Sequence, residues 1–174
     1  MIETDHRFVV EAPLGDVWSY VSEIGNWASS MPGYQSFEET DERHSTWVLK
    51  VALGALTRTM RLNVTIDDQR EPEFISFSLE GANDPVSGRG SFAATATGPG
   101  QTSVVVALAI AGSGPMAGTM EAMSRPIVPR MTRAVSESLK QAIEASSTAP
   151  APTPAPRRRW WSRWRLWLRR RVPG

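Results

Sequence analysis

The sequence predicts an α+β domain in which an antiparallel sheet is crossed by one long helix. Segments with alternating apolar and polar residues follow one another between residues 34 and 111, joined by short links rich in Gly and Pro. Short links favour an antiparallel meander, because parallel neighbours need long crossovers. After Gly112-Ser113-Gly114, apolar residues recur at helical spacing to about residue 145. With 174 residues, the chain accommodates one such domain and a tail.

The domain is expected to begin with a strand at residues 2–12, which Pro13 ends. Proline suits the first turn of a helix, so Pro13 also favours a short helix there. The residues that follow it at helical spacing are Leu14, Val17, Trp18 and Val21. A second short helix is predicted at residues 24–31, broken by Pro32-Gly33.

Six further strands complete the predicted sheet, at residues 34–40, 45–51, 57–67, 73–80, 90–97 and 101–111. In the third of these, Met60, Leu62, Val64 and Ile66 share one face. The Gly88–Gly90 stretch is interpreted as a bend before a strand, because no strand-to-helix transition surrounds it as a phosphate loop requires.

The long helix is predicted from a row of apolar residues at spacings of three and four, which would form one continuous stripe: Met116, Met120, Met123, Ile127 and Met131. Pro126 and Pro129 lie inside this segment, so we expect a kink or a restart near Arg125.

Three parts are expected along the chain: a domain at residues 1–145, a Pro-rich linker at residues 146–156 and a basic tail at residues 157–174. Prolines at four alternate positions make the linker a semi-rigid, extended spacer. The tail contains eight of the 19 Lys and Arg residues and none of the 18 Asp and Glu residues, so residues 1–156 carry a net charge of −7 and the tail +8. An anionic partner is therefore expected at the tail.

As a helix, the tail would have Trp160, Trp161, Trp164, Trp167 and Leu168 within an arc of about 120°, with most arginines outside it. Such a helix suits the headgroup layer of an anionic membrane. We assign membrane binding to Arg159, Trp160, Trp161, Arg163, Trp164, Arg165, Trp167, Leu168, Arg169 and Arg170. A solvated, unstructured basic end is an alternative, and a nucleic acid stacked on tryptophan is another. Clustering of the tryptophans on one side favours lipid.

A peripheral position on the cytoplasmic side of the cell membrane is expected. No apolar run approaches the 18 residues of a membrane-spanning helix. The acidic start of the chain lacks the charged and apolar regions of a signal peptide.

Residues that could carry chemistry are few. The chain has no cysteine, and neither His6 nor His44 has a partner at metal-ligand spacing. Asp67-Asp68 is typical of a turn, and Asp16 suits a helix start. No nucleophile motif is present. The sequence therefore offers no catalytic constellation and no metal site.

Methionines on the long helix could face small residues of the last two strands, namely Ala94, Ala96, Ala107, Ala109 and Ala111. Pliable and small side chains together could leave a void for an apolar ligand of variable shape. The alternative is that the methionine row fills a tight core.

Several strings in order resemble the SRPBCC or START-like superfamily, specifically the CoxG group, whose members are associated with carbon monoxide dehydrogenase. They are FVVEAPLGDVWSYVSEIGNWASSMPGYQSFEE, KVALGALTRTMRLNVTIDD, SGRGSFAA and TSVVVALAIAGSGPMAG. The resemblance implies a helix-grip fold, a curved sheet around a long C-terminal helix with a hydrophobic cavity between. It also implies binding of lipids, polyketides, hormones or quinone-like molecules, and a link to membrane attachment of the molybdenum CO dehydrogenase. Trp18, Pro32, Gly33 and the helix from Met116 match family landmarks.

We therefore expect a non-catalytic, membrane-tethered protein that binds a quinone or a lipid and serves a molybdenum hydroxylase such as CO dehydrogenase. No resident cofactor or metal is expected, and nucleic acid is a disfavoured partner. The predicted ligand-binding residues are Trp18, Met60, Leu62, Phe77, Ala107, Ala109, Met116, Met120, Met123, Ile127 and Met131. Two alternatives stay open. One is a polyketide cyclase or aromatase using His6 or Arg61, and the other is an assembly scaffold for a metalloenzyme.

Overall fold

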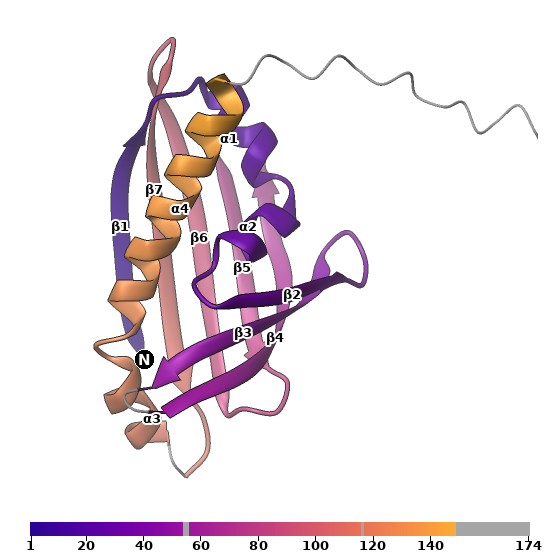
Figure 1. Ribbon diagram of the computed structural model, residues 1–174, viewed down its shortest axis with the longest axis vertical. Helices are drawn as coiled ribbons and strands as arrows, with labels where there is room; N and C mark the ends of the chain where they lie inside the picture. Colours follow the sequence, from indigo (N-terminus) through magenta and orange to yellow (C-terminus); the bar gives the residue numbers. More distant parts are fainter. Residues whose placement is uncertain (54–55, 116, 149–174) are drawn as a thin grey trace, which may run out of the picture.

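The computed structural model describes residues 1–53, 56–115 and 117–148, apart from the side chains of residues 53, 56 and 120. It confirms the α+β fold, with a curved antiparallel sheet and a long C-terminal helix (Figure 1). The seven-stranded sheet has the order β1-β7-β6-β5-β4-β3-β2. Its strands are β1 (Ile2–Val10), β2 (Tyr34–Glu39), β3 (His44–Leu53), β4 (Leu56–Arg70), β5 (Phe74–Gly81), β6 (Val86–Gly98) and β7 (Gln101–Gly112).

The described helices lie on one face of this sheet (Figure 1). They are α1 (Leu14–Val21), α2 (Ile24–Ser30), α3 (Ala117–Ser124) and α4 (Val128–Thr148). Helix α4 runs along the sheet from α3 at one end to α1 at the other, and it packs chiefly against β1 and β7 (Figure 1). Among the described residues, no helix is long and apolar enough to span a bilayer.

The predicted meander is confirmed from β2 to β7, since each of these strands pairs antiparallel with the next. Strand β1 pairs with β7, so the first and the last strands of the sheet in sequence lie side by side. The row of alternate β4 residues named above is also confirmed. Leu62 and Val64 are buried in the core, with Met60 and Ile66 packed against it.

Two predicted boundaries are wrong. Gly88–Gly90 belongs to strand β6 and is not a bend. A Cβ atom on Gly90 would clash with the Phe77 ring, so glycine is required there by packing and not by a turn. Helix α4 continues to Thr148, so the first three residues of the predicted linker are helical. The rest of the linker and the whole tail lie outside the described residues.

The long helix is interrupted where the prolines predicted it, because proline cannot donate a backbone hydrogen bond. Helix α3 ends at Ser124, and α4 restarts at Val128. The prediction of one continuous methionine stripe is wrong. The restart changes the helical phase, so Met123 is 40% exposed while Met131 is half-buried.

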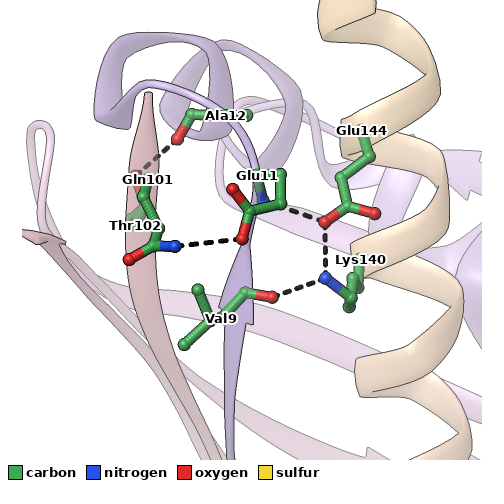
Figure 2. Close-up of polar contacts among 7 residues, drawn as sticks. All are labelled: Val9, Glu11, Ala12, Gln101, Thr102, Lys140 and Glu144. Carbon is green, nitrogen blue, oxygen red and sulfur yellow. Dashed lines mark hydrogen bonds and ion pairs between the residues drawn. The ribbon is translucent and has the colours of Figure 1, made fainter. Parts of the chain in front are cut away.

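A polar cluster fastens the C-terminal half of α4 to the ends of β1 and β7 (Figure 2). The Lys140 ammonium donates to the Val9 carbonyl at 2.6 Å and pairs with the Glu144 carboxylate at 2.5 Å. The Glu11 N–H donates to the same Glu144 oxygen at 2.9 Å. Beside them, the buried Thr102 hydroxyl donates to the Ala12 carbonyl at 2.8 Å. This end of the helix is therefore tied to the sheet by side chains.

These contacts hold the pKa of Glu144 below its usual value of 4.5, chiefly through the Glu11 N–H and then through Lys140. A carboxylate with a lowered pKa stabilises the fold above its unfolded pKa, and that stabilisation is lost as the pH falls through the folded value. We expect Glu144→Gln to reduce the free energy of unfolding by about 1 kcal/mol at neutral pH. The difference from wild type should shrink below pH 4.5. Urea denaturation of both proteins across this range measures it. A difference independent of pH would contradict the assignment.

Candidate functional site

An apolar cavity of about 120 Å³ lies between the inner face of the sheet and helices α2, α3 and α4. Its inner end is closed by the buried indole rings of Trp27 and Trp47. Its other end is bordered by half-buried side chains from several elements, including Met31, Met60 and Met131. The lining side chains are thus buried near Trp27 and Trp47 and more accessible toward the junction of α3 and α4, which we take as the open end of the cavity.

Three of the four polar side chains at the cavity wall are already bonded elsewhere, and the fourth is the half-buried Ser124. The Trp27 indole N–H donates to the Val21 carbonyl at 2.8 Å, and the Trp47 indole N–H donates to the Ser45 hydroxyl at 2.9 Å. The Thr132 hydroxyl donates to the Val128 carbonyl of its own helix at 3.1 Å. No ionisable side chain is found among the described lining residues. An occupant would gain from apolar contact, while a buried charge would have no partner.

Six of the predicted ligand-binding residues border this cavity: Met60, Leu62, Phe77, Ala107, Ile127 and Met131. The sheet brings the first four together from β4, β5 and β7, and the restart of the long helix supplies the other two. Whether they bind a ligand stays a prediction. Met116 and the side chain of Met120 lie outside the described residues.

Three predicted residues lie elsewhere. Trp18 is buried in the core but outside the cavity wall. Ala109 lies on the outer face of the sheet between Glu3 and Arg89, whose side chains pair at 3.2 Å. The inward positions of β7 are Val106, Leu108 and Ile110, so of its three alanines only Ala107 borders the cavity, and Ala109 and Ala111 do not. Met123 is exposed because the break between α3 and α4 places it on a different face from Met131.

The part of the cavity wall that α2 and β3 supply was not predicted from the sequence. Trp27 lies in α2, and Met31 directly follows the last residue of that helix. Trp47, Leu49 and Val51 alternate along β3 and all line the cavity. These patterns are visible in the sequence, but only the fold shows that the two faces meet.

The isolated polar residues of the domain have structural partners. His44 pairs with Asp41 at 2.8 Å, and the Ser147 hydroxyl donates to Asp16 at 2.6 Å. His6 stacks on Phe8 with ring centroids 6.0 Å apart, and the exposed Arg61 lies on the outer row of β4. Neither His6 nor Arg61 borders the cavity. In the part of the chain that the structure describes, no cluster of three His, Cys, Asp or Glu side chains could hold a metal ion.

The cavity volume limits what fits without rearrangement. A dry cavity of about 150 Å³ in another protein takes one benzene ring, whereas sites for drug-sized ligands measure about 300–1,000 Å³. At about 120 Å³, this cavity is of the size that holds one ring. A larger molecule would have to extend through the open end or displace side chains there.

Residues 1–144 match the family model described as polyketide cyclase / dehydrase and lipid transport. No curated protein is significantly similar to the chain in sequence. Solved structures share the fold at low identity. A conserved protein from Geobacillus kaustophilus is 15% identical with a TM-score of 0.72, the match covering 83% of this chain and 97% of that one.

Two further solved structures are similar. A START superfamily protein from Mycobacterium smegmatis is 15% identical with a TM-score of 0.64, covering 82% of this chain and 97% of that one. The Zhui aromatase/cyclase from Streptomyces sp. R1128 is 17% identical with a TM-score of 0.58, covering 83% and 92%. Identities this low support a shared fold and leave the chemistry to be argued from the cavity.

The contact between Gly90 and Phe77 provides a test of the cavity's shape. In Gly90→Ala the new methyl group should push the Phe77 ring into the cavity and lower the free energy of unfolding by about 1–3 kcal/mol. Affinity for toluene, a neutral one-ring probe, should fall about five- to thirtyfold, which corresponds to about 1–2 kcal/mol. NMR titration measures the binding. Gly100→Ala is the matched control, because nothing lies within 4 Å of its Cβ position. Equal toluene affinity in both variants would show that Phe77 does not shape the cavity.

Proposed function

From the premise that this chain belongs to the polyketide cyclase / dehydrase and lipid transport family, we propose that it is a non-catalytic carrier of an apolar molecule. The ligand is a quinone or a lipid, and the C-terminal tail holds the protein peripherally on the cytoplasmic side of the membrane. The observation that carries this proposal is a cavity bordered almost entirely by apolar side chains, in which three of the four polar side chains are already bonded. Such a cavity favours an occupant through burial of apolar surface.

The cavity supports binding better than catalysis. Aromatase/cyclases occur among the structural neighbours, so a cyclase is the alternative from the same fold. Acid–base catalysis needs a proton donor or acceptor within hydrogen-bond reach of the substrate. His6 and Arg61, the two candidates for that role, lie outside the cavity wall. A carrier needs no such group.

Membrane tethering is proposed from the tail sequence. Helix α4 ends at Thr148, so the Pro-rich spacer and the tail follow directly on the last described element. In an amphipathic helix, the four tryptophans and eight arginines of the tail would combine insertion of indole rings with attraction to anionic lipid. The acidic net charge of residues 1–156 leaves the tail as the basic end of the chain.

Membership of the CoxG group and service to a molybdenum hydroxylase such as CO dehydrogenase form the finer part of the proposal. Its support is the ordered set of sequence strings described above, together with a tail suited to a membrane. A quinone ring matches a cavity that holds one ring, with an isoprenoid chain leaving through the open end. In this view the protein moves a quinone between the bilayer and an enzyme at its surface.

Filling the open end of the cavity tests the carrier role. Val51 borders the cavity on β3, whereas Val48 of the same strand does not. We expect Val51→Phe to lower affinity for a short-chain quinone at least about tenfold and Val48→Phe to leave it unchanged, because tenfold corresponds to about 1.4 kcal/mol of lost contact. Calorimetry measures the affinity, and mass spectrometry of organic extracts identifies any ligand that co-purifies. Empty extracts together with no affinity for quinone or lipid would reject the carrier role.

Removal of residues 157–174 tests the anchor. We expect the truncated protein to stop co-sedimenting with anionic vesicles, because the basic tail supplies the attraction. Replacement of the four tail tryptophans by serine is the control that keeps every arginine. It should weaken sedimentation less than truncation does, and it should abolish the blue shift of tryptophan emission on vesicles. Unchanged sedimentation of the truncated protein would reject the tail as the anchor.

A further inference from the structure

The open end of the cavity lies at the α3–α4 elbow, which we define as residues 122–133. Ser124, Ile127 and Met131 of this segment border the cavity. The elbow lies at the opposite end of the domain from the β6–β7 turn (Figure 1). Any molecule that enters or leaves through the open end must pass this segment.

The elbow is basic although the domain as a whole is acidic. Arg125, Arg130 and Arg133 are exposed, and residues 122–133 contain no Asp or Glu. Within the described residues, no carboxylate lies at ion-pair distance from any of the three. Elsewhere in the described domain, Arg58, Arg70, Arg89 and Lys140 each have a carboxylate partner, while the other basic side chains are single positions on the strands and their links. The acidic residues that flank the elbow are Glu121, one turn before Arg125 and bonded to the Met1 amino group at 2.8 Å, and the exposed Glu137, one turn after Arg133.

Apolar surface accompanies this charge. Met123 is 40% exposed, one of few large hydrophobic side chains of the described chain that are so accessible. Pro126 and Pro129 are exposed beside it, and Ile127 and Met131 are only half-buried. Arginine next to accessible apolar side chains is the composition that settles at a lipid headgroup layer.

We infer that the elbow is a second membrane contact, which docks the open end of the cavity against the surface of an anionic bilayer. The inference rests on the proposed carrier function and names the partner of its cavity. An apolar ligand leaving the bilayer would then enter the cavity without crossing water. At about fivefold in partition for each basic residue near an anionic leaflet, three arginines together contribute about a hundredfold.

The net charge of the domain makes this contact selective in orientation. Residues 1–156 carry −7, so most orientations present an acidic surface to an anionic bilayer and are repelled. Screening at physiological salt limits the interaction to about 8 Å. Only the side that touches the membrane therefore matters, and the elbow brings three exposed arginines together within nine residues.

The position of the tail is compatible with simultaneous contact. Helix α4 has 21 residues, which is about 32 Å at 1.5 Å per residue. A Pro-rich spacer of eight residues, the number between Thr148 and the tail, would span about 25 Å at about 3.1 Å per residue. A helix inclined toward the bilayer thus lets the tail and the elbow contact the same surface.

The test uses the full chain, which contains no cysteine, with one cysteine introduced for an environment-sensitive dye. Ala122→Cys places the dye on the exposed side of α3, and Thr95→Cys places it on exposed β6 toward the opposite end. On vesicles containing phosphatidylglycerol, we expect the dye at residue 122 to shift to the blue and to be quenched by lipids with nitroxide on their chains. The dye at residue 95 should do neither.

Replacing the three elbow arginines by glutamine should reduce quenching at residue 122 to the level seen at residue 95. Arg7→Gln, Arg43→Gln and Arg70→Gln together remove the same charge from other exposed positions and should leave the quenching unchanged. Toluene binding in solution reports separately on the cavity, and vesicle sedimentation reports on the tail. A protein that binds toluene and sediments with vesicles, yet shows no quenching at residue 122, would overturn the inference. Equal loss of quenching in both triple variants would overturn it too.

Discussion

The architecture depends on a mismatch between a straight helix and a curved sheet. Helix α4 covers β1 and β7, where Lys140 and Glu144 tie its C-terminal half to the strand ends. It cannot also cover the inner rows of β3, β4 and β5, which curve away from it (Figure 1). The indole rings of Trp27 and Trp47 close part of that gap. What remains is a ring-sized apolar cavity, and the indole N–H groups at its wall already have hydrogen-bond partners.

Much of the fold could be predicted because alternation in strands and spacing in helices are local signals. The inward row of β4 and the helical break near Arg125 follow directly from the order of residues. The wall of the cavity is a property of the assembled fold. Gly88 and Gly90 look like a turn in the sequence, yet they are strand residues whose missing side chains make room for Ile110 and Phe77. Likewise, the alanines of β7 share a row, but only Ala107 borders the cavity, and Ala109 lies on the outer face of the sheet.

The prolines of the long helix have a further consequence that spacing alone could not show. Because Pro126 and Pro129 end one helix and begin another, the methionines on either side no longer share a face. Ile127 and Met131 turn toward the cavity, and Met123 turns to solvent. The break that removes the predicted stripe thereby creates an exposed apolar corner at the open end.

The tail and the elbow are the two basic parts of the chain, and both can contact the same bilayer surface. The acidic domain would be repelled by an anionic bilayer in most orientations, and a basic tail alone would hold it nearby without choosing a side. Unpaired arginines beside the open end supply that choice, since short-range attraction survives screening only where the surfaces touch. Tethering by the tail would then raise the local concentration of the domain at the bilayer. The elbow would decide which end of the cavity contacts the lipid. A carrier for an apolar molecule needs both, because proximity without orientation would leave the ligand to cross water.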